Sequence, residues 1–360
     1  MADRLDPVLR DALVREFRAR VYARLGYIEF PHQATWRAAT EGYALTTTAV
    51  DPTDALPPGC ARYQVQYTDP TRVPDVTRIR TEWHLATPRP HGPVHYAALL
   101  AAYKAGKSEQ MGMWSTGFAC IPNALVQLIG VEYKTAEQEF GYLVDALLGS
   151  RGMRLKKRHL YFDVRNGRLH LELTNGMTFE VKSWERKESL KGHQVTAMLA
   201  CESYQLPGLE SFTTISQNLR AERGYYAWAS TCDAPWLGEL HEMGHGRDPD
   251  WGCVCGTPGW TNPFSFELRA LLRDCPDISL LQPYYKEFPW LTRVTEQHIK
   301  GLMTRERFAI AWLGQLGTYA GRVYNYQRGS CLFGPESHPQ LFQRTVDDEA
   351  LDEAAEVSAV

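Results

Sequence analysis

The feature that most constrains the fold is an apolar run, residues 94–100, that leads into a loop ending in Gly106, Lys107 and Ser108. A buried strand followed by G-x4-G-K-[ST] is the P-loop pattern. Its backbone N–H groups surround a phosphate chain, its Lys adds a positive charge and its hydroxyl holds Mg²⁺. The match is incomplete, because Ala101 stands at the first glycine position. The alternative is a surface loop, since Gly-Lys-Ser is a common tripeptide.

The composition is that of a globular α/β protein. Of the 360 residues, 44% are apolar and 22% are charged, and a chain of this length can bury a full core. No apolar run approaches the roughly 20 residues that span a bilayer, and the N-terminus lacks the regions of a signal peptide. We therefore expect a cytoplasmic protein with no membrane contact and with reduced cysteines.

The first predicted helix begins at Asp6-Pro7 and ends at Gly26. Asp is a good N-cap and Pro suits the first helical position. Apolar residues recur at helical spacing within it: Leu9, Leu13, Phe17 and Val21. Residues 51–93 are rich in Pro and Thr, which predicts loops and edge strands.

Beyond residue 94 the pattern alternates between strands and helices. Asn175-Gly176 predicts the turn of a β-hairpin, and a helix is expected to begin near Lys107. The fold class we expect is α/β, with a central, mostly parallel sheet flanked by helices. The other predicted strands cover residues 124–130, 168–183, 195–200 and 225–229, with a helix over 135–148.

A P-loop NTPase needs, besides its phosphate-binding loop, a second strand that ends in acidic residues. Residues 195–200 form an apolar run followed by Cys201 and Glu202. Glu202 is the predicted catalytic carboxylate, and Cys201 occupies the position that is usually Asp. A neutral thiol is a poor ligand for a hard cation. A third strand ends in Ser230 and Thr231, whose hydroxyls suit contact with phosphate or water, or simply the start of a turn.

In their order, these motifs resemble the ATPase domain of the large subunit of tailed-phage terminases, over residues 20–325. The resemblance implies that the Gln33 amide contacts adenine and that Lys191 stands for the family's arginine, which acts on a neighbouring subunit's ATP. It also implies coupling of hydrolysis to movement through Ser230-Thr231. The remaining nucleotide contacts would come from the loop: Ala101, Lys104, Ala105, Gly106, Lys107 and Ser108, the last also holding Mg²⁺.

The resemblance further implies a P-loop NTPase of the additional-strand type that hydrolyses ATP to move double-stranded DNA into a procapsid. The expected domains are an ATPase domain over 1–285 (adenine side 1–90, nucleotide core 91–285), a helical lid over 286–325 and an acidic tail over 326–360. Expected partners are a portal protein, a small terminase subunit and further copies in a ring, as a pentamer, in the host cytoplasm. The family's nuclease domain is not expected here and would be on a separate chain or lost.

DNA contact would have to be local, since the net charge of −3 gives no global attraction to nucleic acid. The densest basic run contains Arg154, Lys156, Lys157 and Arg158. Such a run suits contact with phosphates, but it also suits a solvated linker between a helix and a strand.

Two other functions fit parts of the sequence. A helicase-like translocase would use the same ATP site. A zinc metallopeptidase is suggested by His241-Glu242-x-x-His245, in which two His ligands and a general base share a helix. Gly244, Gly246 and Pro249 break that helix, and Cys253-Val-Cys255 lacks the usual spacing of a zinc knuckle.

Overall fold

The computed structural model describes residues 6–68, 79–89, 92–93, 95–100, 106–190, 194–219 and 224–231, with the single positions 236, 302, 304 and 307. All of them belong to one compact unit, residues 1–317. The predicted lid, the acidic tail, the His241–His245 motif and Cys253-Val-Cys255 fall mostly or wholly outside the described residues.

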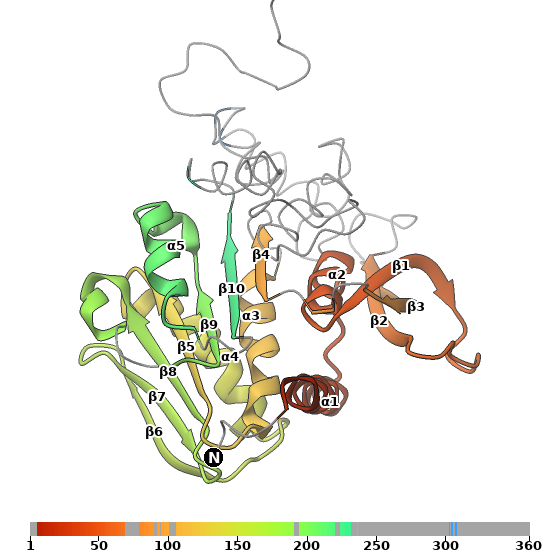
Figure 1. Cartoon of the computed structure of the whole chain (residues 1–360), viewed down its shortest axis with the longest axis horizontal. Helices are drawn as coiled ribbons and strands as arrows, with labels where there is room; N and C mark the ends of the chain where they lie inside the picture. The colour runs from red at the N-terminus through yellow and green to blue at the C-terminus, as the bar shows by residue number, and fades with distance from the viewer. Residues whose placement is uncertain are drawn as a thin grey trace, which may run out of the picture. The chain divides into compact units, whose positions relative to one another are not determined.

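The centre of this unit is a seven-stranded mixed sheet in the order β4-β10-β9-β5-β8-β7-β6 (Figure 1). From β4 to β8 every neighbouring pair is parallel, and β8, β7 and β6 continue as antiparallel strands. The expected α/β class with a mostly parallel sheet is therefore confirmed. The bounds are β4 Tyr96–Leu100, β5 Leu125–Gly130, β6 Lys157–Asp163, β7 Arg168–Leu173, β8 Thr178–Ser183, β9 Ala197–Ala200 and β10 Tyr225–Ser230.

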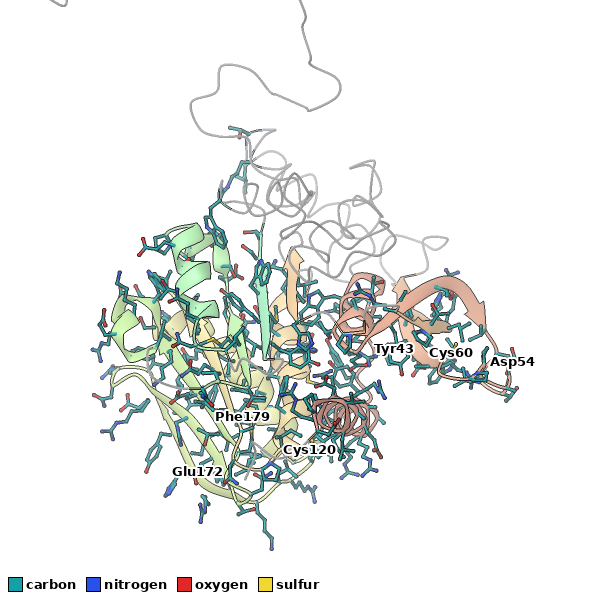
Figure 2. The ribbon with its side chains drawn as sticks, viewed as in Figure 1. Tyr43, Asp54, Cys60, Cys120, Glu172 and Phe179 are labelled. Atoms are coloured by element: carbon teal, nitrogen blue, oxygen red, sulfur yellow. The ribbon has the colours of Figure 1, made fainter. Side chains whose placement is uncertain are left out.

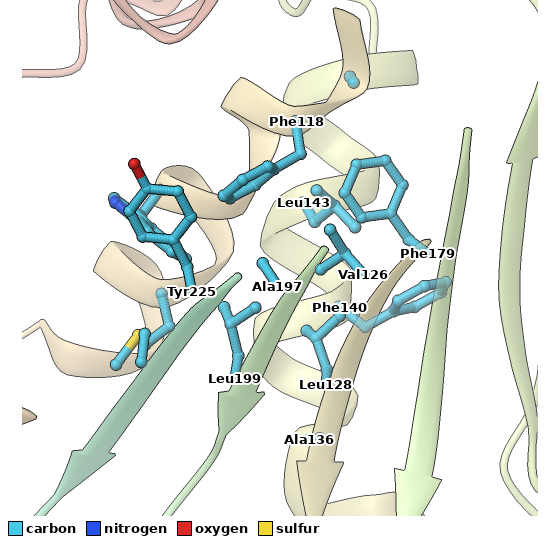
Figure 3. Packing of buried hydrophobic residues seen from close by; sticks show 14 of the residues in the cluster. Phe118, Val126, Leu128, Ala136, Phe140, Leu143, Phe179, Ala197, Leu199 and Tyr225 are labelled. Atoms are coloured by element: carbon cyan, nitrogen blue, oxygen red, sulfur yellow. The ribbon is translucent and has the colours of Figure 1, made fainter. Parts of the chain in front are cut away.

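Helices cover both faces of this sheet, which is why β9 and β10 are buried along their whole length. β8, where the antiparallel part begins, alternates between buried and partly buried residues. One face packs against α3 (Lys107–Ser115), the 3-10 helix η2 (Thr116–Cys120) and α4 (Glu137–Leu148). Figure 3 shows Val126 and Leu128 of β5 against Phe140 and Leu143 of α4. The opposite face carries Met198 and Trp228, together with Ile215 of α5 (Leu209–Ser216). Burying each such side chain contributes about 1.5–3 kcal/mol.

The predicted hairpin is present as β7 and β8, joined by a turn over residues 174–177. Gly176 has a φ of +81°, and the backbone N–H of Met177 donates to the Asn175 side chain at 3.1 Å. Gly176 supplies the positive φ of the turn without a steric cost, and the Asn175 side chain accepts a backbone hydrogen bond within it.

The first helix, α1 (Pro7–Leu25), has the predicted ends. The Asp6 carboxylate accepts from the N–H of Val8 at 2.8 Å, and Gly26 closes the helix with a φ of +64°. The apolar stripe does not define the buried face, however, because Leu9 is 51% exposed and Leu13 is 36% exposed. Val21 is the one stripe residue that is fully buried, and four residues outside the stripe are buried with it: Arg10, Val14, Arg18 and Tyr22.

The first 90 residues contain a separate three-stranded antiparallel sheet rather than loops and edge strands alone. Its order is β1-β3-β2, with bounds Tyr43–Val50, Ile79–Pro88 and Ala61–Thr68. Ala34 and Ala38 of α2 (Pro31–Thr40) pack against Tyr63 and Val65 of this sheet. The extent of this sheet was not predicted from the sequence, although the alternation of Tyr63, Val65 and Tyr67 with polar residues along β2 was an available signal.

Three cysteines lie among the described residues, Cys60, Cys120 and Cys201, and each is a free thiol. Figure 2 shows Cys60 beside the three-stranded sheet and Cys120 close to α1. The expected reduced state holds for these three. Within the described part of the chain, no helix combines the length and the hydropathy that a membrane span requires.

Candidate functional site

The phosphate-loop motif is described from Gly106 onward, and Ala101, Lys104 and Ala105 lie outside the described residues. Gly106 is the N-cap of α3 with a φ of +72°. The backbone angle favours glycine, and a Cβ at this position would lie 2.5 Å from Nε2 of Gln33, so a larger residue would also have to displace that side chain. Lys107 is buried and Ser108 is partly buried in the first turn of α3. The predicted start of this helix is thus confirmed.

Gln33 lies against this turn, and both ends of its amide are engaged. Its Oε1 accepts from the N–H of Phe30 at 2.9 Å, and its Nε2 donates to the Gly106 carbonyl at 3.0 Å. The side chain therefore holds the start of α2 to the start of α3. An adenine contact would use the second hydrogen of Nε2 or the second lone pair of Oε1.

A buried ionic network contacts α3, and it was not predicted from the sequence. Arg18 pairs with Glu41 at 2.6 Å, and Arg37 pairs with Glu29 at 2.6 Å and with Glu41 at 3.3 Å. Gln110 of α3 donates to Glu29 at 2.6 Å. The network therefore connects α1 and α2 to the helix that carries Lys107 and Ser108.

The two carboxylates of this network differ in their pKa. Burial raises the pKa of Glu29, and its contacts with Arg37 and Gln110 only partly offset that effect. Burial also acts on Glu41, but the ion pairs with Arg37 and Arg18 and a hydrogen bond from Tyr63 outweigh it and lower the pKa. Glu41 is thus held as a charged group between the two arginines.

The predicted acidic strand end is present at the end of β9. Cys201 is fully buried, and burial raises the pKa of its thiol well above the usual range. Glu202 follows with a φ of +47°, a left-handed conformation that costs a non-glycine residue about 1–2 kcal/mol. Its Oε2 is buried and has no hydrogen-bond partner among the described residues. Strain of this kind often marks functional positions.

A residue that the sequence analysis missed lies beside this strand end. Glu139, in the first turn of α4, is 1% exposed, and burial raises the pKa of its carboxyl to about 7. The nearby side chains of Ser108 and Cys201 partly offset the rise in this pKa, and the charge of Glu202 adds to it. Its helical spacing from Ala136 and Leu143 places it on the apolar face of the predicted helix, which was the available signal.

The third predicted strand end, on β10, contacts the second directly. The register pairs Trp228 with Ala200 and Ser230 with Leu100, so the carboxyl ends of β4, β10 and β9 lie at one edge. The Ser230 hydroxyl accepts from the N–H of Tyr204 at 2.9 Å and donates to the Thr231 carbonyl at 2.7 Å. The Thr231 hydroxyl is buried and has no hydrogen-bond partner among the described residues.

The other predicted functional residues are basic, and they are either outside the described residues or exposed. Lys191 lies outside the described residues. Arg186 is exposed and its guanidinium lies 5.9 Å from the centre of the Tyr133 ring. Arg154, Lys156, Lys157 and Arg158 are all exposed, and the last two belong to the edge strand β6. Arg158 pairs with Glu172 at 3.1 Å, so part of the positive charge of this patch is neutralised locally.

The described residues contain no group of three or more His, Cys, Asp or Glu side chains arranged to hold a metal by themselves. Mg²⁺ in nucleotide sites needs no such group, because phosphates and water complete its octahedral shell. The hydroxyl of Ser108 and the buried carboxylate oxygens of Glu139 and Glu202 fit a nucleotide-bound Mg²⁺ of that kind. The N-terminus of α3 fits the phosphates of such a nucleotide.

The sequence matches no protein-family model and no curated protein. Among solved structures, the chain is similar to the Thermus phage P74-26 large terminase ATPase domain, with 17% identity and a TM-score of 0.41 over 61% of this chain and 88% of that one. It is also similar to the large terminase from the thermophilic bacteriophage D6E, with 13% identity and a TM-score of 0.42 over 64% of this chain and 50% of that one. A D6E structure in complex with ADP gives 13% identity and a TM-score of 0.39 over 62% and 48%. A likeness of this strength does not assign a function.

Proposed function

We propose that this chain is an ATP-hydrolysing motor subunit that moves double-stranded DNA into a phage procapsid, as the large subunit of a terminase does. The observation that carries the proposal is the meeting of three sequence motifs at one edge of the sheet. Ser108 follows β4, Glu202 follows β9 and Ser230 ends β10. Nucleotides bind at the carboxyl ends of parallel strands in open α/β sheets.

The strand order supports the additional-strand type of P-loop fold. β10 lies between β4, which leads toward the phosphate loop, and β9, which leads to the acidic residues. This inserted strand ends in Ser230, so a polar residue stands between the loop and the catalytic carboxylate. The proposed cofactors are ATP and Mg²⁺, and the bound metal would neutralise charge on the phosphates.

Each residue then has a defined role in the proposal. Lys107 contributes a positive charge beside the phosphates, and Ser108 contributes its hydroxyl to the metal. Glu202 orients a water molecule for attack, and its uncommitted Oε2 is free to accept a proton or a hydrogen bond from that water. Lys191, with Arg186 as the nearby alternative, would act on a neighbouring subunit's nucleotide in a ring, where Lys retains the charge of Arg but not its planar fork.

Ser230 is proposed to couple hydrolysis to movement. Its hydroxyl holds the N–H of Tyr204, two residues beyond Glu202 in the chain. A conformational change at Glu202 during turnover would therefore be transmitted to β10 through this hydrogen bond. DNA would be contacted through the exposed basic residues near β6: Arg154, Lys156, Lys157 and Arg158.

The proposal is tested by nucleotide binding and by ATPase activity with and without double-stranded DNA. We expect tight binding of ATP, turnover that needs Mg²⁺, and stimulation by DNA and by a portal protein. DNA stimulation that is independent of a portal would favour a helicase-like translocase. Stoichiometric zinc in the purified protein without nucleotide binding would favour a metallopeptidase and overturn the proposal.

A further inference from the structure

The proposed Mg²⁺ site lacks a carboxylate at position 201, where the chain has Cys201. This residue stands where a metal-organising Asp is expected, and its thiol is buried and neutral. Neutral sulfur is a weak ligand for Mg²⁺, which prefers oxygen. If nothing replaced the missing carboxylate, Ser108 and the proposed catalytic Glu202 would be the only groups available to the metal among the residues that the structure describes.

Glu139 brings a carboxylate to the same place from a different element. Its side chain is almost completely buried, yet Oε2 has no hydrogen-bond partner among the described residues. The groups that act on this carboxylate include the Ser108 hydroxyl, the Cys201 thiol and its own backbone N–H. An oxygen that is buried, unpartnered and next to the proposed metal-binding hydroxyl is costly unless a ligand uses it.

The packing of α3 on α4 allows this approach. A Cβ at Gly112 of α3 would lie 2.6 Å from the carbonyl oxygen of Glu139 and 2.7 Å from the Cβ of Tyr142. Only glycine permits the two helices to come this close. Because Ser108 is one turn before Gly112 on α3, the same close approach brings Glu139 to Ser108.

We infer that Glu139 supplies from α4 the carboxylate that the chain lacks at position 201, and that it orients the Ser108 hydroxyl and the water molecules around a nucleotide-bound Mg²⁺. The inference rests on the proposed ATP site. Glu139 is a positioning residue in this scheme, because it acts through Ser108 and water rather than on the reacting phosphate.

The inference changes the expectation for Cys201→Asp. In a chain without a nearby acid, this substitution would restore a metal-organising carboxylate. Here the new Asp would lie against Glu139, and two buried like charges in contact repel each other. Restoration should therefore require the pair of changes Glu139→Gln and Cys201→Asp, which moves the carboxylate from α4 to β9.

The test is a titration of Mg²⁺ against binding of a fluorescent ATP analogue, which does not depend on turnover. We expect Glu139→Gln to raise the half-saturating Mg²⁺ concentration by about tenfold or more, the usual effect of removing an outer-shell ligand partner. Binding of the analogue in EDTA should be unchanged. Glu137→Gln is the matched control, since Glu137 lies in the same first turn of α4 and its loss removes the same charge.

The double variant Glu139→Gln/Cys201→Asp should return the Mg²⁺ curve to within about threefold of the wild type, whereas Cys201→Asp alone should not improve it. Identical curves for Glu139→Gln, Glu137→Gln and the wild type would overturn the inference while the ATP site stands. If the wild type and Lys107→Ala both fail to bind the analogue, the proposed function and the inference fall together. Melting of each protein without ligand checks folding, and Glu139→Asp, which keeps the charge but withdraws the carboxylate, repeats the test if the Gln variant does not fold.

Discussion

The backbone N–H of Tyr204 donates a 2.9 Å hydrogen bond to the hydroxyl of Ser230. This bond joins the end of β10 to the turn that follows Glu202, between segments that are distant in the sequence. The same hydroxyl donates to the Thr231 carbonyl, so its one donor and one of its two acceptor lone pairs are used. Ser230 is therefore part of the structure around the proposed catalytic carboxylate.

Ser230→Ala should separate nucleotide binding from DNA-stimulated turnover. The variant leaves the N–H of Tyr204 without its acceptor, which costs about 1–3 kcal/mol of unfolding free energy. We expect unchanged binding of an ATP analogue and loss of the stimulation by DNA. Urea unfolding and ATPase rates with and without DNA check this. Ser230→Thr keeps the hydroxyl and serves as the control; full DNA stimulation in the Ala variant would remove Ser230 from the coupling path.

Lys107→Ala should abolish nucleotide binding, because it removes the charge that is proposed to face the β- and γ-phosphates. Fluorescence titration with an ATP analogue measures the effect. Lys134→Ala removes the same charge from an exposed position and should bind normally. Wild-type ATP hydrolysis by the Lys107 variant would show that the phosphate-loop assignment is wrong.

Glu202→Gln should retain nucleotide binding and lower turnover by about 10²-fold or more, as expected when a catalytic acid or base is lost. The substitution preserves size and leaves the left-handed backbone as it is. Single-turnover hydrolysis measures the step directly. Glu185→Gln, at an exposed position, is the control. Unchanged turnover in the Glu202 variant would assign the catalytic role to another residue.

Gly106→Ala should destabilise the protein for two separable reasons. The φ of +72° costs a non-glycine residue about 1–2 kcal/mol, and the new Cβ would meet Gln33 at 2.5 Å. The double variant Gly106→Ala/Gln33→Ala removes the collision but not the backbone strain. We therefore expect the double variant to lose less unfolding free energy than the sum of the losses in the two single variants, as measured by urea unfolding. Strictly additive losses would mean that Gln33 moves aside freely.

Glu41→Gln should lower the unfolding free energy at neutral pH by about 3–5 kcal/mol, because it leaves two buried arginines with one partner fewer. The folded-state pKa of Glu41 is lowered, so its contribution is present above the ordinary carboxyl pKa and is lost as the pH falls through the folded value. The wild type should therefore lose more stability than the variant on acidification from pH 7. Glu16→Gln breaks only an exposed pair with Arg20 and should change stability by less than about 1 kcal/mol. Equal acid sensitivity of the wild type and Glu41→Gln would contradict the role of this ion pair.

Local pattern was sufficient for most of the elements. The caps of α1, the turn at Gly176, the start of α3 after Gly106 and the apolar strands β5, β9 and β10 all follow from residue types within a few positions of each other. Helix caps, glycine turns and hydrophobic runs act over such short distances, so the sequence alone determined these features and the α/β class.

Tertiary structure decided what depends on contacts between distant segments. The order that inserts β10 between β4 and β9 cannot be read from the strands themselves, since each is equally apolar. The burial of Arg18 and the exposure of Leu9 reverse the expectation from the helical stripe, because Glu41 lies beside Arg18 only after folding. Glu139 is an unremarkable helical acid in the sequence. It lies beside Ser108 because Gly112 lets α4 approach α3 closely, and no local pattern encodes which helix will pack there.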